Sequence, residues 1–88
     1  MSEHNEYSAQ PISLDQSARY QIEVQGRLDQ KWGMSFEGMA MTSETLSTGL
    51  AVTRLCGIVA DQAALHGMLN QIRDLGLPLL SVQLLGTL

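Results

Sequence analysis

The most informative pattern of apolar and polar positions lies in residues 61–82. Apolar side chains there recur at spacings of three and four, which predicts one stripe of an amphipathic helix from about Gln62 to Leu75: Ala64, Leu65, Met68, Leu69, Ile72 and Leu75. Asp61 suits the N-cap, because its carboxylate can accept from the unpaired N–H groups of the first turn. Gly76 suits the left-handed residue that follows a helix, and Pro78 prevents the helix from continuing.

Two apolar runs flank this helix and read as strands. Leu50–Val59 precedes the helix, and Leu79–Leu85 follows it with only Ser81 and Gln83 polar, so the second run is apolar on both faces. Strand, helix and strand with short connections predict that the two strands run parallel with a right-handed crossover. The later strand could pair beside the earlier one or across a subunit boundary.

A period of two upstream predicts two more strands. Residues 19–28 alternate cleanly, whereas Met34–Thr42 alternates imperfectly, and a bulge near Gly38 would shift its faces. Ser43–Gly49 then reads as a hairpin connection. The predicted order is β-β-β-α-β, an α+β two-layer sandwich with a mostly antiparallel sheet and one helix on one face. We expect residues 1–17 to form a mobile tail and residues 18–88 to form a single domain.

One helix is too narrow to cover this sheet. A helix is about 10 Å across, whereas four strands are about 20 Å wide. The third and fourth strands are apolar on both sides, and soluble monomers rarely expose large apolar patches. We therefore expect a homo-oligomer, most simply a dimer, joined through the open sheet face or by edge pairing. The candidate interface residues are Met39, Met41, Val52, Cys56 and Ile58.

Charge and cysteine content narrow the possible partners. The formal net charge is −4 and the five Lys and Arg residues are scattered, which disfavours nucleic-acid binding. No apolar run approaches the roughly 20 residues of a membrane span, and the acidic, polar start is unlike a secretory signal. A single cysteine excludes an intramolecular disulfide and fits a reducing compartment. We expect a cytoplasmic protein that binds neither membrane nor nucleic acid, with its own copies or another protein as partner.

Candidate chemistry is sparse. Cys56 and His66 form a nucleophile–base combination, but Cys56 lies within an apolar strand, where a small buried side chain is the simpler interpretation. No metal-ligand spacing occurs, so we expect no catalytic residue, no metal and no cofactor. Asp61 and Gln62 are candidate ligand-binding residues because a helix N-terminus offers unpaired N–H groups. His66 and Trp32 complete that candidate set.

Gly67 lies in the middle of the predicted helix. Glycine there costs about 1 kcal/mol relative to alanine. The position therefore predicts that a strand, Trp32 or a partner subunit approaches closely.

Several motifs carry a resemblance to a known family. G-R-L-D at 26–29, Trp32, Phe36 and Gly38, D-Q-A-A-L-H-G at 61–67 and R-D-L-G-L-P-L at 73–79 resemble the signature of a family of short, functionally uncharacterised bacterial proteins. The resemblance covers about residues 19–85 and implies no activity. The order strand, Asp, helix, Gly, strand is also similar to the first half of an ACT-type regulatory domain. That second resemblance implies a ferredoxin-like fold with small ligands at a dimer interface, although the second half is absent here.

Three functional hypotheses follow. The first is a non-catalytic oligomeric module for interaction or regulation. The second is a small-molecule-sensing domain of ACT-like type, which predicts a cavity near Asp61, His66 and the methionines. The third is a small cofactor-free enzyme in which His66 is paired with Glu37 or Asp29.

Overall fold

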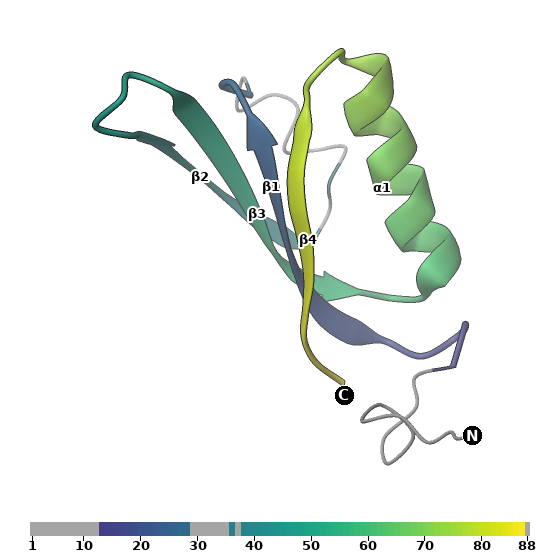
Figure 1. Cartoon of the computed structure of the whole chain (residues 1–88). Coiled ribbons are helices and arrows are strands. Elements are labelled where there is room, and N and C mark those ends of the chain that lie inside the picture. The colour runs from purple at the N-terminus through teal and green to yellow at the C-terminus, as the bar shows by residue number, and fades with distance from the viewer. Residues whose placement is uncertain (1–12, 29–35, 37, 88) are drawn as a thin grey trace, which may run out of the picture.

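The computed structural model of the protein describes residues 13–28, 36 and 38–87 (Figure 1). The elements follow one another as β1 (Ala18–Gln25), β2 (Met39–Thr45), β3 (Ala51–Val59), α1 (Gln62–Asp74) and β4 (Leu79–Thr87). The predicted order β-β-β-α-β and the α+β class are therefore confirmed.

The four strands form one antiparallel sheet in the order β2-β3-β1-β4. Both β3 and β4 are antiparallel to β1, so they run parallel to each other, as the strand–helix–strand pattern predicts. They are not neighbours, however, because β1 is inserted between them. β4 therefore pairs with β1, which is neither of the two positions considered from the sequence.

The hydrophobic core lies between α1 and the face of the sheet that carries the even-numbered residues of β1. Ala18, Ile22 and Val24 are fully buried there. Leu65 and Ile72 of α1 are buried against them. The rest of the predicted helix stripe packs against the same cluster: Ala64, Met68, Leu69 and Leu75.

The ends of α1 follow the sequence signals closely. The Asp61 carboxylate accepts a hydrogen bond from the Ala64 N–H at 2.7 Å, as an N-cap does. Gly76 has φ +79°, so the chain leaves the helix through a left-handed residue. Arg73 lies in the last turn, where a cation favours the helix dipole.

The glycines differ from expectation at two positions. A side chain built at Gly67 would meet nothing within 4 Å among the described residues, so no strand makes the predicted close approach. Trp32 lies outside those residues, and an approach by a partner subunit stays a prediction. Gly57 in β3 is the crowded position instead. A Cβ atom there would collide with the Gly38 carbonyl oxygen and contact the Met39 Cα atom.

β2 differs from its prediction in its bounds, and the chain near Gly38 turns where a bulge was considered. It begins at Met39 and continues to Thr45, so part of the expected hairpin connection is strand. Met41 pairs with Leu55 on the helix-facing side, and Phe36, which precedes the strand, is 1% exposed in the same core. The turn at Gly38 (φ +83°) separates Phe36 from the strand, so the expected alternation does not continue through it.

Thr53 is a buried polar residue that fixes the segment after β1. Its hydroxyl donates to the Gly26 carbonyl at 2.7 Å and accepts from the Leu28 N–H at 3.2 Å. Both partners lie just beyond the end of β1. Thr53 therefore holds Leu28 over the core, where only 8% of that residue is exposed.

The described part of the predicted tail contacts the start of α1. The Leu14 carbonyl accepts from the Gln62 N–H at 2.8 Å, and the Ser17 hydroxyl donates to the Ala60 carbonyl at 3.1 Å. The side chain of Leu14 is nevertheless exposed. The remainder of the predicted tail lies outside the described residues.

Candidate interaction surface

Within the described part of the chain, the largest concentration of exposed apolar side chains lies along β4. Each of its five large apolar residues is between 37% and 48% exposed: Leu79, Leu80, Val82, Leu84 and Leu85. The strand contains no charged residue. It also occupies one edge of the sheet, and no strand within the described residues lies beyond it (Figure 1). We refer to Leu79–Leu85 as the β4 edge.

The sheet register explains why the β4 edge is exposed. Val82 pairs with Ile22 and Leu84 pairs with Tyr20, so both side chains point to the face that carries α1. The helix packs over the buried residues of β1 and β3, and β4 lies outside this core. The pairing of β4 with β1 shifts register near Leu80 and again near Leu85. Between these two irregularities, Ser81–Leu84 pairs regularly with β1. Burial therefore stops at β1, and the apolar residues of β4 face solvent.

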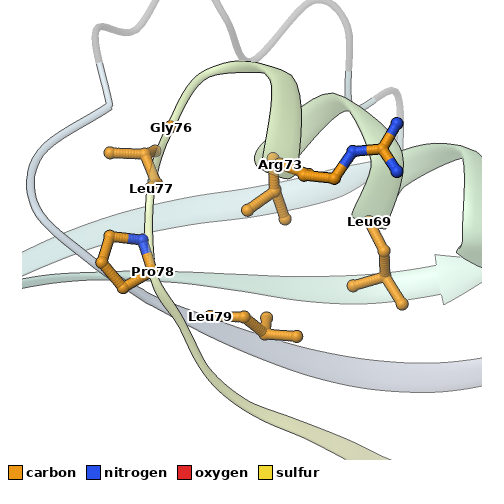
Figure 2. A pocket seen from close by; sticks show the side chains of 7 residues that line it. Leu69, Arg73, Gly76, Leu77, Pro78 and Leu79 are labelled. Carbon is orange, nitrogen blue, oxygen red and sulfur yellow. The ribbon is translucent and has the colours of Figure 1, made fainter.

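A shallow hollow continues this surface at the C-terminal end of α1 (Figure 2). Its volume is about 350 Å³, and Leu79 forms part of its wall. Among the described residues, Arg73 is the one charged residue in the lining. The other lining residues are Leu69, Ile72, Gly76, Leu77 and Pro78. The hollow and the β4 edge thus form a continuous, mostly apolar region.

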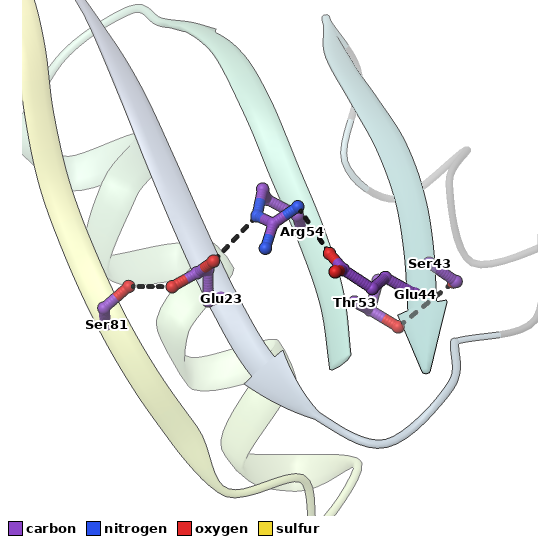
Figure 3. A network of polar contacts seen from close by, with 6 residues as sticks. All are labelled: Glu23, Ser43, Glu44, Thr53, Arg54 and Ser81. Carbon is purple, nitrogen blue, oxygen red and sulfur yellow. Dashed lines mark hydrogen bonds and ion pairs between the residues drawn. The ribbon is translucent and has the colours of Figure 1, made fainter. Parts of the chain in front are cut away.

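The opposite face of the sheet carries a polar network across all four strands (Figure 3). Arg54 on β3 donates from Nε to Glu23 on β1 at 2.7 Å and from Nη1 to Glu44 on β2 at 3.2 Å. The Ser81 hydroxyl on β4 donates to Glu23 at 2.9 Å. The hydrogen bond from Arg54 holds the pKa of the Glu23 carboxyl below its ordinary value, and the hydrogen bond from Ser81 lowers it further by a smaller amount.

This network changes the expectation for the open face. The sequence predicts an apolar patch there, because Val52, Cys56 and Ile58 share that side of β3. In the structure Val52 is only 5% exposed and Cys56 is half-buried. Ile58 is the large apolar residue of β3 that stays exposed, at 45%.

The five candidate interface residues do not form one surface. Met39 and Met41 lie on the other side of the sheet and pack against the core under α1. The structure instead places the exposed apolar residues on β4. The sequence does contain a signal for this, because Leu79–Leu85 is apolar on both faces and only one face can be covered by a single helix.

The candidate ligand-binding residues at the strand-to-helix corner have structural partners. The Asp61 carboxylate caps α1, and the Gln62 amide Nε2 donates to the Tyr20 hydroxyl at 2.6 Å. His66 is exposed on α1. Trp32, Glu37 and Asp29 lie outside the described residues. The hollow described above lies at the opposite end of α1 from Asp61.

Catalytic and metal chemistry gain no support from the geometry. Cys56 lies on the sheet face opposite α1, so it cannot form a hydrogen bond with His66 on the helix. Within the described residues, no group of three His, Cys, Asp or Glu side chains could hold a metal ion. In the same part of the chain, no helix is long and apolar enough to cross a membrane.

Comparisons with known proteins place the chain in a family but assign it no activity. Neither curated proteins nor solved structures give a match. A family model described as a domain of unknown function matches residues 19–83, which include all but the first residue of β1, the whole of β2, β3 and α1, and the start of β4. The chain therefore belongs to the family Domain of unknown function (DUF8691).

Proposed function

We propose that this domain is a non-catalytic self-association module, most simply a homodimer, that serves assembly or regulation. The observation that carries the proposal is the β4 edge. Five half-exposed large apolar side chains lie in one uncharged edge strand. The free Cys56 fits the reducing cytoplasm in which we place the protein.

The usual protections of an edge strand are weak in β4. Natural edge strands avoid association through charged residues, especially lysine, through proline, or through bulges. β4 has no charge and no proline within its bounds, and its register shifts leave a regular run between them. Contact with another protein would remove these side chains from water, which is favourable in proportion to the apolar area buried.

A second copy of the chain fits this surface better than a charged partner. The net charge of −4 comes from residues outside β4, so two copies could meet at this strand without direct charge repulsion. A nucleic-acid partner would need clustered positive charge, which the surface lacks.

The test is the molar mass of the untagged protein by light scattering coupled to size exclusion. We expect a molar mass near twice that of the 9.6 kDa chain, or a higher multiple, at micromolar to millimolar loading. Leu84→Glu should shift the protein to monomer, because a carboxylate would then be buried at the contact. A wild-type protein that is monomeric at every concentration would overturn the proposal.

Ile58→Glu is the matched control. Ile58 and Leu84 are similarly exposed, at 45% and 48%, but Ile58 lies on β3 on the opposite face of the sheet. We expect this variant to associate as the wild type does. Loss of association in Ile58→Glu but not in Leu84→Glu would move the interface to the open face of the sheet. Circular dichroism should show that both variants are folded.

The hollow supports a second candidate, a small-molecule-sensing domain of the ACT-like type implied by the sequence resemblance. An apolar lining with one cation at Arg73 suits a small apolar carboxylate. Such ligands should raise the melting temperature of the wild type but not of Arg73→Gln. Equal shifts in both proteins, or no shift, would exclude this hollow as the site.

A further inference from the structure

We propose that two copies join by antiparallel pairing of β4 with β4, with the twofold axis at Val82, to form a continuous eight-stranded sheet. This inference rests on the self-association proposed above and specifies its geometry. The occupant of the β4 edge is thus the same strand of a second copy.

The sequence of the β4 edge is symmetric in residue class about Val82. Leu79-Leu80-Ser81-Val82-Gln83-Leu84-Leu85 reads as two leucines, a polar residue, valine, a polar residue and two leucines in either direction. A twofold interface needs this property, because residue i contacts residue j while j contacts i. With the axis at Val82, Leu80 lies opposite Leu84, Leu79 opposite Leu85, and Ser81 opposite Gln83. An axis at Gln83 would instead set Leu80 against Gly86 and Leu79 against Thr87.

The backbone directions agree with this register. The Gln25 N–H donates to the Pro78 carbonyl, whereas the Gly26 N–H donates to the Ala51 carbonyl. Odd-numbered residues of β1 therefore direct their backbone groups to β4, and Ser81 and Gln83 are their partners. Because these groups alternate along a strand, Val82 and Leu84 direct theirs to the outer edge. Val82 can thus form a hydrogen-bonded pair with Val82 of the second copy.

The side chains in this arrangement meet on matching faces. A twofold axis perpendicular to the sheet leaves both α1 helices on the same side. Val82 and Leu84 point to that side in each copy. The pairing would therefore bring Val82 and Leu84 of the two copies together on the α1 side and remove part of their apolar surface from water.

Disulfide trapping tests the register. In a Cys56→Ser background, which lacks other cysteines, Ser81→Cys and Gln83→Cys are prepared separately. They are then mixed, unfolded, refolded together and mildly oxidised. Residues 81 and 83 of opposite copies form a non-hydrogen-bonded pair with Cα atoms about 4.5 Å apart, within the range for a disulfide. We expect the mixed 81–83 product to exceed either self-linked product about tenfold, as read by mass spectrometry.

Other products separate the failure of this inference from that of the proposed function. Efficient linkage of Gln83→Cys to a second Gln83→Cys chain would place the axis at residue 83. Efficient linkage of Ser81→Cys to a second Ser81→Cys chain would place it at residue 81. Either product would overturn the register. Dimers in light scattering without any linkage would overturn β4 pairing while leaving self-association intact. Monomeric wild-type protein would overturn both. Ser81→Cys removes the hydroxyl that donates to Glu23, so circular dichroism of each variant should first match that of the wild type.

Discussion

Gly57 and Gly67 illustrate how differently two glycines can act in one small domain. Gly57 lies where β2 and β3 approach so closely that a methyl group would meet the Gly38 carbonyl. Gly67 is exposed in the middle of α1 with open space around it. The first is required by packing, whereas the second reduces helix stability without a structural reason among the described residues.

Alanine substitutions at these positions should therefore have opposite effects on stability. Gly67→Ala should raise the free energy of unfolding by about 1 kcal/mol, because alanine loses less backbone entropy in a helix. Gly57→Ala should lower it by about 1 to 3 kcal/mol, because the strands must separate to accept the methyl group. Urea denaturation of both variants measures the two values. A destabilised Gly67→Ala would indicate a neighbour of α1 outside the described residues.

Glu23 should contribute to the acid sensitivity of the fold. Hydrogen bonds from Arg54 and Ser81 lower its pKa in the folded protein below the ordinary value of 4.5. The carboxylate therefore stabilises the folded state above pH 4.5, and this stabilisation is lost as the pH falls through the lower folded pKa. Glu23→Gln should show a smaller loss of stability between pH 7 and pH 3 than the wild type.

The matched control for Glu23→Gln is Asp74→Asn. Asp74 also contacts an arginine, Arg73, but at 3.5 Å with both side chains more than 70% exposed. Urea denaturation at several pH values should give Asp74→Asn the wild-type slope in the acid range. If Glu23→Gln shared that slope, its hydrogen bonds would not contribute to the pH dependence of stability.

At the level of elements, Thr53 connects β3 to the segment that follows β1. Its hydroxyl satisfies the Gly26 carbonyl and the Leu28 N–H inside the protein. Thr53→Val keeps the shape but leaves both groups without this partner, so we expect a loss of about 1 to 3 kcal/mol. Ser43→Ala is the control. It removes a longer contact to the same hydroxyl, at 3.4 Å, from a residue that is exposed to water, so we expect a smaller loss. Equal losses in the two variants would argue against this role for Thr53.

The elements that the sequence predicts well are those defined by local signals. The cap at Asp61, the stripe from Ala64 to Leu75 and the exit at Gly76 depend on neighbours within one or two turns. The insertion of β1 between β3 and β4 is not predicted, because strand order depends on contacts between distant segments. The shift of faces near Gly38 is anticipated from the sequence as a bulge, but it results from one left-handed turn that separates Phe36 from the strand it precedes.

The candidate site is predicted less well than the fold, for a physical reason. Apolar runs identify which strands are apolar on both faces, and the sequence indicates this for β4. Which strand lies at the edge follows only from the sheet order. The sequence therefore places the expected interface residues on β2 and β3, whereas most of the exposed large apolar side chains among the described residues lie on β4.

For the whole molecule, self-association should couple melting to concentration. If unfolding includes dissociation of a dimer, the melting temperature should rise by about 3 to 5 °C for each tenfold increase in protein. Differential scanning calorimetry over two decades of concentration measures this shift. Leu84→Glu should melt at a temperature independent of concentration. A concentration-independent wild type would show that the folded chain does not depend on a second copy.

The central place of β1 also has a consequence for how fast the molecule can fold. Both neighbours of β1 come from far along the chain, since Ala18 lies opposite Val59 on one side and Thr87 on the other. Closing loops of this length costs chain entropy before the strand contacts that stabilise either pairing can form. The protein should therefore fold more slowly than a helical bundle of similar size. Until β3 and β4 have paired with it, β1 has two unpaired edges. Dilute refolding should therefore outperform concentrated refolding, even for a protein whose native state associates.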